Sequence, residues 1–147
     1  MNDVYIASGA RTPMGGFQGS LSDLGAVDLG AAAIKEAVSR ANLDGSDIEE
    51  IIIGCVLPSG LRQGPARQAA IDAGIPVESG ATTINKLCGS GMKATMLAHD
   101  LIKAGTNEIM VSGGMESMSN APYLLPKARA GLRMGHQEIQ DSMFTDG

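Results

Sequence analysis

The chain has 147 residues, a formal net charge of −5 and 44% hydrophobic residues. That length is typical of one globular domain that buries a real hydrophobic core. The acidic balance, with no cluster of Lys or Arg, argues against binding of nucleic acid through a basic surface. No apolar run approaches the roughly 18 residues of a membrane span. The first residues also lack the basic and apolar regions of a secretory signal.

The composition is unusual in its small and aromatic residues. The chain contains 20 Gly and nine Met, but only two Tyr, two Phe and no Trp. This predicts an aliphatic core in which backbones approach closely. The two cysteines, Cys55 and Cys88, are too few for a disulfide scaffold. We therefore expect a reducing, cytoplasmic location.

The first predicted elements are a strand, a loop and a helix. Residues 4–7 form a short apolar run that predicts a strand, and Gly and Pro in residues 9–16 predict a loop. From Val27 to Ala41, apolar residues recur at helical spacing, so we expect an amphipathic helix that ends near Asn42.

Strands and helices then alternate along the chain. The β-branched run 51–57 predicts a strand buried on both faces, as in a parallel sheet, and residues 65–74 begin with Pro and end with Gly, as helices do. Further strands are expected at 81–85 and at 108–112, the second closed by a Gly-Gly pair, with a helix at about 91–103 between them. The alternation predicts a layered α/β domain with right-handed crossovers.

The last part of the chain is irregular. Residues 121–147 contain scattered Pro and Gly and show no convincing period, which is unusual inside a complete domain. The sequence also stops on the turn-like pair Asp146-Gly147. We therefore expect the sequence to be a piece of a longer protein.

The strongest candidate for chemistry is Cys88, in the segment Asn-Lys-Leu-Cys-Gly-Ser-Gly-Met-Lys-Ala at 85–94. A Cys between a strand and a helix lies on a tight turn, near the free N–H groups and positive end of the helix, which favour the reactive thiolate. The N–H groups of Cys88, Gly89 and Gly91 could hold the oxygen of a thioester or an oxyanion.

The position of Cys88 also fits a purely structural role in the core, because free Cys is among the most buried residue types and behaves as a small hydrophobe. Position alone leaves both interpretations open. Cys55 lies inside an Ile-rich run, where a core position is expected. A Cys nucleophile needs a base, usually His. His99 falls roughly 16 Å further along the predicted helix, and His136 lies in the irregular tail, so the base must come from elsewhere.

The glycine-rich loop does not predict a phosphate site. It lacks both the dinucleotide-binding fingerprint and the Gly-Lys-Ser/Thr ending of a P-loop. The sequence also contains no cluster of residues with metal-ligand spacing, so we expect no metal centre.

Four motifs, in the order of the family, resemble the N-terminal half of thiolases. They are Ala-Arg-Thr-Pro at 10–13, Gly-Pro-Ala-Arg-Gln-Ala-Ala at 64–70, Asn-Lys-Leu-Cys-Gly-Ser-Gly at 85–91 and Gly-Gly-Met-Glu-Ser-Met-Ser at 113–119. The resemblance implies a thiolase-like layered αβα fold with a mixed, largely parallel sheet. It also implies a core of the N-terminal domain at 1–119, and the start of a truncated loop domain at 120–147.

The resemblance implies an acyltransferase of the acetyl-CoA C-acetyltransferase type, an activity of fatty acid metabolism that joins two acetyl-CoA or cleaves a 3-ketoacyl-CoA. Cys88 would be the nucleophile that carries the acyl group as a thioester, with its backbone N–H in an oxyanion hole. In the family, a His, an Asn and a second Cys of the C-terminal half complete the site. Coenzyme A thioesters would be substrates, with no bound cofactor, and the full-length protein would form a homodimer or homotetramer.

Two alternatives remain at this stage. The ketoacyl synthases, related condensing enzymes, carry Ser directly after the nucleophilic Cys, where Gly89 stands here, so this position favours a thiolase. The chain could also be a non-catalytic fragment or an interaction module. Whether the chain is the N-terminal fragment of an acyltransferase or a non-catalytic piece, we expect the isolated 147 residues to lack thiolase turnover.

Overall fold

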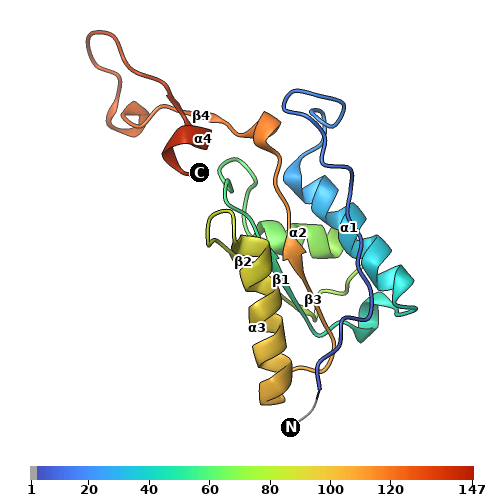
Figure 1. Ribbon diagram of the computed structural model, residues 1–147. Helices are drawn as coiled ribbons and strands as arrows, with labels where there is room; N and C mark the ends of the chain where they lie inside the picture. Colours follow the sequence, from blue (N-terminus) through green and yellow to red (C-terminus); the bar gives the residue numbers. More distant parts are fainter. Residues whose placement is uncertain (1–2) are drawn as a thin grey trace.

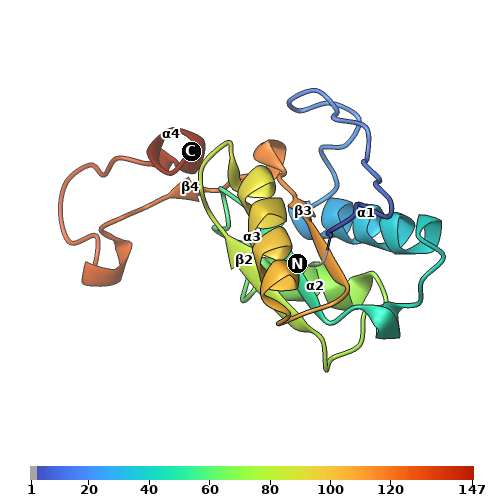
Figure 2. The same cartoon turned by 60° about the horizontal axis from the view of Figure 1, so that its bottom comes forward.

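The computed structural model of the protein describes residues 3–147, which form a layered body and a projecting arm (Figure 1). Helices α1 (Ala26–Arg40) and α2 (Pro65–Asp72) cover one face of a three-stranded sheet, and α3 (Ser90–Ala104) covers the other. The same three layers are visible from a second direction (Figure 2). This arrangement confirms the predicted layered α/β fold.

The sheet is parallel and has β1 (Glu50–Gly54) at its centre. Strand β2 (Gly80–Ile84) pairs with one side of β1, and β3 (Met110–Gly114) pairs with the other. All three strands therefore end at the same edge of the sheet.

The central strand is buried on both faces, as its β-branched run predicts. Ile51, Ile52 and Ile53 are at most 4% exposed. Because side chains alternate along a strand, Ile51 and Ile53 pack into the core beneath α1 and α2, while Ile52 lies on the α3 face. The core on the α1 and α2 side also contains small and aliphatic residues from both helices: Ala26, Ile34, Val38, Ala66, Ala69 and Ala70.

The helix ends follow the signals expected from the sequence. The Asp28 carboxylate accepts a hydrogen bond of 2.9 Å from the N–H of Gly25 at the start of α1. Helix α2 begins with Pro65, and α3 is followed by Gly105 in the left-handed conformation, with φ +74°. The three predicted helices are confirmed.

The predicted strand at 4–7 is wrong. Tyr5 and Ile6 are 81% and 86% exposed, and among residues 3–147 no strand pairs with this segment. The Ser8 hydroxyl donates to the carbonyl of Ala37, so the chain beyond this run is fastened to α1 instead. An apolar run becomes a strand only where a neighbouring strand satisfies its backbone N–H and C=O groups, which periodicity alone does not show.

The last strand of the sheet lies further along the chain than predicted. We expected a strand at 108–112 that a Gly pair closes, but β3 includes Gly113 and Gly114, which pair with Ile53 and Gly54 of β1. Glycine is disfavoured in strands in general, so its presence here indicates that another backbone approaches closely.

Beyond Asn120 the chain forms the arm, which projects from the body in both ribbon views (Figures 1 and 2). A two-stranded antiparallel ribbon joins β4 (Tyr123–Leu124) to β5 (Gln140–Asp141), and the four-residue helix α4 (Ser142–Thr145) follows. Three short 3-10 turns complete the elements, at Gly45–Asp47, Met118–Asn120 and Ala128–Ala130.

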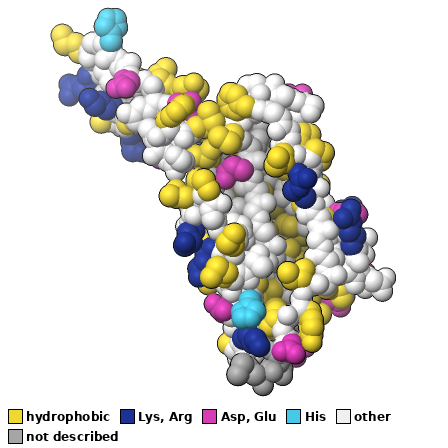
Figure 3. Space-filling view, in the orientation of Figure 1, with side chains coloured by type: hydrophobic (Ala, Val, Ile, Leu, Met, Phe, Trp, Pro, Cys, Tyr) yellow, Lys and Arg dark blue, Asp and Glu magenta, His cyan; other side chains and the backbone are white. Residues whose placement is uncertain are grey.

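Apolar side chains reach the surface over much of the arm and the adjoining part of the body (Figure 3). Met92, Tyr123 and Phe144 are each more than 60% exposed. None of the helices within residues 3–147 is both long enough and apolar enough to cross a lipid bilayer.

Candidate active site

The carboxyl ends of three parallel strands meet at one edge of the sheet. At this edge, Gly54 of β1 lies between Ile84 of β2 and Gly114 of β3. Ligand sites of open α/β sheets lie beyond the carboxyl ends of their strands. The sequence places Cys88 after β2 and Glu116 after β3, so both belong to this edge.

Cys88 lies exposed on the turn between β2 and α3. The preceding residue, Leu87, has φ +49°, a left-handed conformation that is strained for a side chain of this kind. Its N–H donates to Oδ1 of Asn85 over 2.9 Å, a local hydrogen bond that stabilises such a turn. The turn therefore presents the Cys88 thiol to solvent.

The same turn is fastened from the helix side by Ser90, which is 4% exposed. The Ser90 hydroxyl accepts a hydrogen bond of 2.8 Å from the Lys86 N–H and donates one of 2.6 Å to the Leu87 carbonyl. The N–H of Gly89 donates to the Lys86 carbonyl over 3.1 Å. Local hydrogen bonds thus hold Lys86, Leu87 and Gly89, three of the four residues that precede α3.

Two backbone N–H groups, that of Cys88 and one three residues further along the chain, remain free of hydrogen bonds within the described part of the chain. The N–H groups of Cys88 and Gly91 have no hydrogen-bond partner among residues 3–147, whereas that of Gly89 is occupied. The expectation that Gly89 serves as a donor to a bound oxygen is therefore corrected. Free N–H groups at a helix start favour a negative charge or a developing oxyanion.

Helix α3 can begin at this edge because three glycines bring the backbones together. A Cβ on Gly54 would lie 2.5 Å from Ser90, and one on Gly114 would lie 3.3 Å from the Cα of Gly91. These glycines therefore allow the close approach of the helix to the sheet.

The second cysteine belongs to the core, as predicted. Cys55 is 1% exposed, and its Sγ lies 3.5 Å from Oε1 of Glu116. Burial and, after it, the negative charge and hydrogen bond of Glu116 raise the pKa of the Cys55 thiol to about 12. Cys55 is thus a protonated thiol at neutral pH and a poor nucleophile.

Glu116 is a site residue that the sequence analysis missed. Its Oε2 accepts a hydrogen bond of 2.8 Å from the Val56 N–H, and its Oε1 accepts one of 3.0 Å from the Leu57 N–H. Glu116 belongs to the motif at 113–119, in which it had no assigned role. Its partners lie about 60 positions upstream in the chain, where no local pattern points to them.

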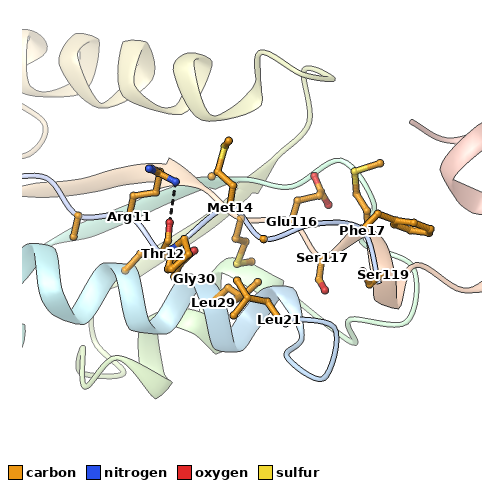
Figure 4. Close-up of a pocket in the computed structure, with 18 residues that line it drawn as sticks. Arg11, Thr12, Met14, Phe17, Leu21, Leu29, Gly30, Glu116, Ser117 and Ser119 are labelled. Carbon is orange, nitrogen blue, oxygen red and sulfur yellow. Dashed lines mark hydrogen bonds between the residues drawn. The ribbon is translucent and has the colours of Figure 1, made fainter. Parts of the chain in front are cut away.

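Two of the four motifs meet in one cavity of about 390 Å³. Figure 4 shows the loop of residues 10–17 on one side, with the segment 114–119 and the start of α1 around it. The Ser117 hydroxyl donates to the Leu24 carbonyl over 2.9 Å. The motif at 113–119 is thus also hydrogen-bonded to the loop that precedes α1. Cys88 does not line this cavity.

The motif at 64–70 has a structural role instead. It forms the start of α2, on the face of the sheet opposite α3. The Arg67 guanidinium donates to the carbonyls of Val77 and Ser79, and the Gln68 amide donates to those of Leu61 and Gln63. These side chains hold the two loops that flank the helix.

Neither histidine is placed as a base for Cys88. His99 lies on the exposed side of α3, where its Nδ1 is 3.1 Å from Oδ1 of Asp100. His136 lies on the exposed outer loop of the arm, which projects away from α3 (Figure 1). Within residues 3–147, no three His, Cys, Asp or Glu residues are grouped to hold a metal ion.

Comparison with known proteins gives consistent matches over the whole chain. The family model described as "Thiolase, N-terminal domain" matches residues 4–147. An acetyl-CoA acetyltransferase of Pseudomonas aeruginosa is 51% identical over 147 residues, which are 100% of this chain and 37% of that protein. Acetyl-CoA acetyltransferase 2 of Arabidopsis thaliana is 54% identical over 145 residues, 99% of this chain and 36% of that protein.

A solved structure agrees with these sequence matches. The Acat5 thiolase from Ascaris suum, crystallised in complex with coenzyme A, superposes with a TM-score of 0.95 and 44% identity. The match covers 99% of this chain and 38% of that one. The chain thus spans a little over a third of the length of the relatives that it matches.

Proposed function

The chain belongs to the thiolase family, and on that premise we propose that it is the nucleophile-bearing N-terminal part of an acetyl-CoA C-acetyltransferase. The observation that carries the proposal is the exposed Cys88, which follows a strained residue just before α3 and whose own backbone N–H is free of hydrogen bonds among residues 3–147. Relatives at about half identity that are named as acetyl-CoA acetyltransferases support this activity over that of a ketoacyl-synthase-like enzyme.

The chemical step assigned to Cys88 is acyl transfer between two thioesters. The Cys88 thiolate attacks the carbonyl carbon of an acyl-CoA, and a new C–S bond forms while the carbonyl oxygen becomes an oxyanion. The Cys88 N–H is a suitable donor to that oxygen. The bond from the carbonyl carbon to the sulfur of coenzyme A then breaks, and coenzyme A leaves as a thiolate that takes up a proton. The acyl group remains on Cys88.

Coenzyme A thioesters are the substrates that this proposal requires, and the complex of a related thiolase with coenzyme A supports that class. We propose residues 1–119 as the N-terminal domain core and 120–147 as the start of the loop domain. The arm that begins near Asn120 supports this boundary, although residues 1–2 lie outside the described residues. The cytoplasmic location and the homodimer or homotetramer stay predictions.

The base that completes turnover is proposed to come from residues outside this sequence. His99 and His136 are its only histidines. His99 lies roughly 16 Å further along the axis of α3 than Cys88, and His136 belongs to the arm. We therefore expect residues 1–147 alone to show no measurable thiolysis of acetoacetyl-CoA. Thiolysis by that purified polypeptide would show that the chain contains its own base.

The experiment is a single-turnover reaction of the full-length protein, of which this chain is proposed to be the N-terminal part, with acetyl-CoA, read by intact mass spectrometry. We expect the gain of one acetyl group, and no gain in Cys88→Ala. Cys55→Ala is the matched control, because its thiol is buried and should not be needed for acetylation. An acetyl adduct that persists in Cys88→Ala would sink the assignment.

A further inference from the structure

We propose that Glu116 is a positioning residue for Cys88, acting through the peptide unit between Val56 and Leu57 and the side chain of Asn85. The inference rests on the proposed function of Cys88 and extends it to a residue on a different strand. Glu116 does not touch the thiol. It fixes the segment against which the Cys88 turn is built.

The first link is a pair of hydrogen bonds that joins the Glu116 carboxylate to the chain just after β1. Both carboxylate oxygens are used, Oε2 by the Val56 N–H at 2.8 Å and Oε1 by the Leu57 N–H at 3.0 Å. Hydrogen bonds to an ionised carboxylate are roughly twice as strong as those between neutral groups. The half-buried carboxylate therefore sets the direction in which residues 55–57 leave the sheet.

The second link is the peptide unit between Val56 and Leu57. Its N–H, that of Leu57, donates to Oε1 of Glu116, and its carbonyl, that of Val56, accepts a hydrogen bond of 3.3 Å from Nδ2 of Asn85. One peptide unit beyond β1 thus joins Glu116, which lies beyond β3, to Asn85, which follows β2. Rotation or displacement of this peptide would move both hydrogen bonds together.

The third link runs from Asn85 to the nucleophile. Oδ1 of Asn85 accepts the Leu87 N–H at 2.9 Å, while Nδ2 is held by Val56, so the amide is fixed at both ends. Leu87 has the strained left-handed conformation, with φ +49°, and Cys88 follows directly. A strained turn persists only where its surroundings hold it. Glu116 and Asn85 supply part of that restraint.

The restraint matters because acyl transfer is sensitive to small displacements. A misplacement of about 1 Å from a distant change can slow a reaction by about a hundredfold. Without the restraint, we expect Cys88 to sample orientations from which it cannot attack the thioester carbonyl. Binding of acetyl-CoA should change little, because Glu116 is not required to contact it.

The test measures the acetylation of Cys88 at a series of acetyl-CoA concentrations, in the whole protein. Glu116→Gln keeps the size of the side chain but replaces one acceptor oxygen with an amide group that cannot accept an N–H. We expect the maximal rate to fall by about tenfold or more, with less than about a twofold change in the half-saturating concentration. Glu78→Gln, at an exposed position, is the matched control and should behave as wild type.

A second pair of variants separates positioning from a general loss of stability. Asn85 is exposed, so Asn85→Ala tests the same relay even where Glu116→Gln fails to fold. If the two residues act in one relay, the double variant should be no slower than the slower single variant. Urea unfolding of each variant checks that the native state remains populated.

The outcomes distinguish this inference from the proposed function. Absence of acetylation in the wild-type protein would overturn both. Normal acetylation of the wild type, with Glu116→Gln and Asn85→Ala within about twofold of it, would overturn the positioning role alone. Rate losses that multiply in the double variant would also contradict the relay, because independent effects add in free energy.

Discussion

The Cα of Gly91, at the start of α3, lies only 3.3 Å from where a Cβ on Gly114 would stand at the end of β3. This contact brings the first turn of the helix directly onto the sheet edge. The turn that carries Cys88 immediately precedes that helix. The place of the proposed nucleophile therefore depends on the absence of side chains beneath it.

The contact of α3 with β1 is tighter still and gives the first prediction. In Gly54→Ala, the new Cβ would lie 2.5 Å from Ser90, so α3 must shift. We expect a loss of about 3 kcal/mol in the free energy of unfolding, at the upper end of typical overpacking costs. Urea unfolding measures it. Gly9→Ala is the control, because no atom lies within 4 Å of its Cβ position. Equal stability of the two variants would contradict the close approach.

The strained turn gives the second prediction. Leu87→Asn should raise the free energy of unfolding by about 1 kcal/mol, because Asn tolerates the left-handed region better than Leu does. Leu87 is 59% exposed, so little burial is lost. Leu132→Asn, at another exposed leucine, should bring no gain. Thermal or urea unfolding decides, and a destabilised Leu87→Asn would argue against strain at this residue.

The pH dependence of stability gives the third prediction. The folded protein raises the pKa of Cys55 to about 12 from an ordinary value of 9.0, so the folded state holds this proton more tightly than the unfolded state. Its contribution to stability is complete below about pH 9 and is lost as pH rises towards 12. The wild type should therefore lose about 1 kcal/mol more than Cys55→Ala between about pH 9 and about pH 10. Parallel curves in urea titrations would contradict this.

The two cysteines should also differ in chemical reactivity. Cys88 is exposed and Cys55 is buried as a protonated thiol. Iodoacetamide at mildly alkaline pH should label Cys88 in the native protein, and Cys55 only after denaturation in urea. Peptide mapping by mass spectrometry reads both sites in one sample. Equal labelling of the two thiols in the native protein would show that the β1 exit is open to solvent.

Much of the fold could be predicted because its central strand and its helix ends are marked by local sequence patterns. The run of Ile residues at 51–53 predicts a strand buried on both faces, and Pro65 and Gly105 mark helix ends. The strand at 4–7 could not be judged, since its existence depends on a partner strand and not on its own residues. The shift of β3 to include Gly114 depends on the approach of α3, which is a tertiary contact.

The candidate site was predictable to a smaller degree. The position of Cys88 between a strand and a helix could be predicted, because alternating periods and the flanking glycines mark that turn. The use of the Gly89 N–H within the turn could not, since it depends on the conformation of the residues inside the turn, among them the left-handed Leu87. Glu116 escaped prediction because its partners are backbone N–H groups of another strand's exit.

The role of Cys88 as the nucleophile is tested most directly by identifying the residue that carries the acyl group. The full-length protein is treated with acetyl-CoA, quenched in acid and digested, and the acetylated peptide is sequenced by tandem mass spectrometry. We expect one acetyl thioester, on Cys88, that is released by neutral hydroxylamine. Acetylation on Cys55 or on a lysine, with Cys88 unmodified, would contradict it.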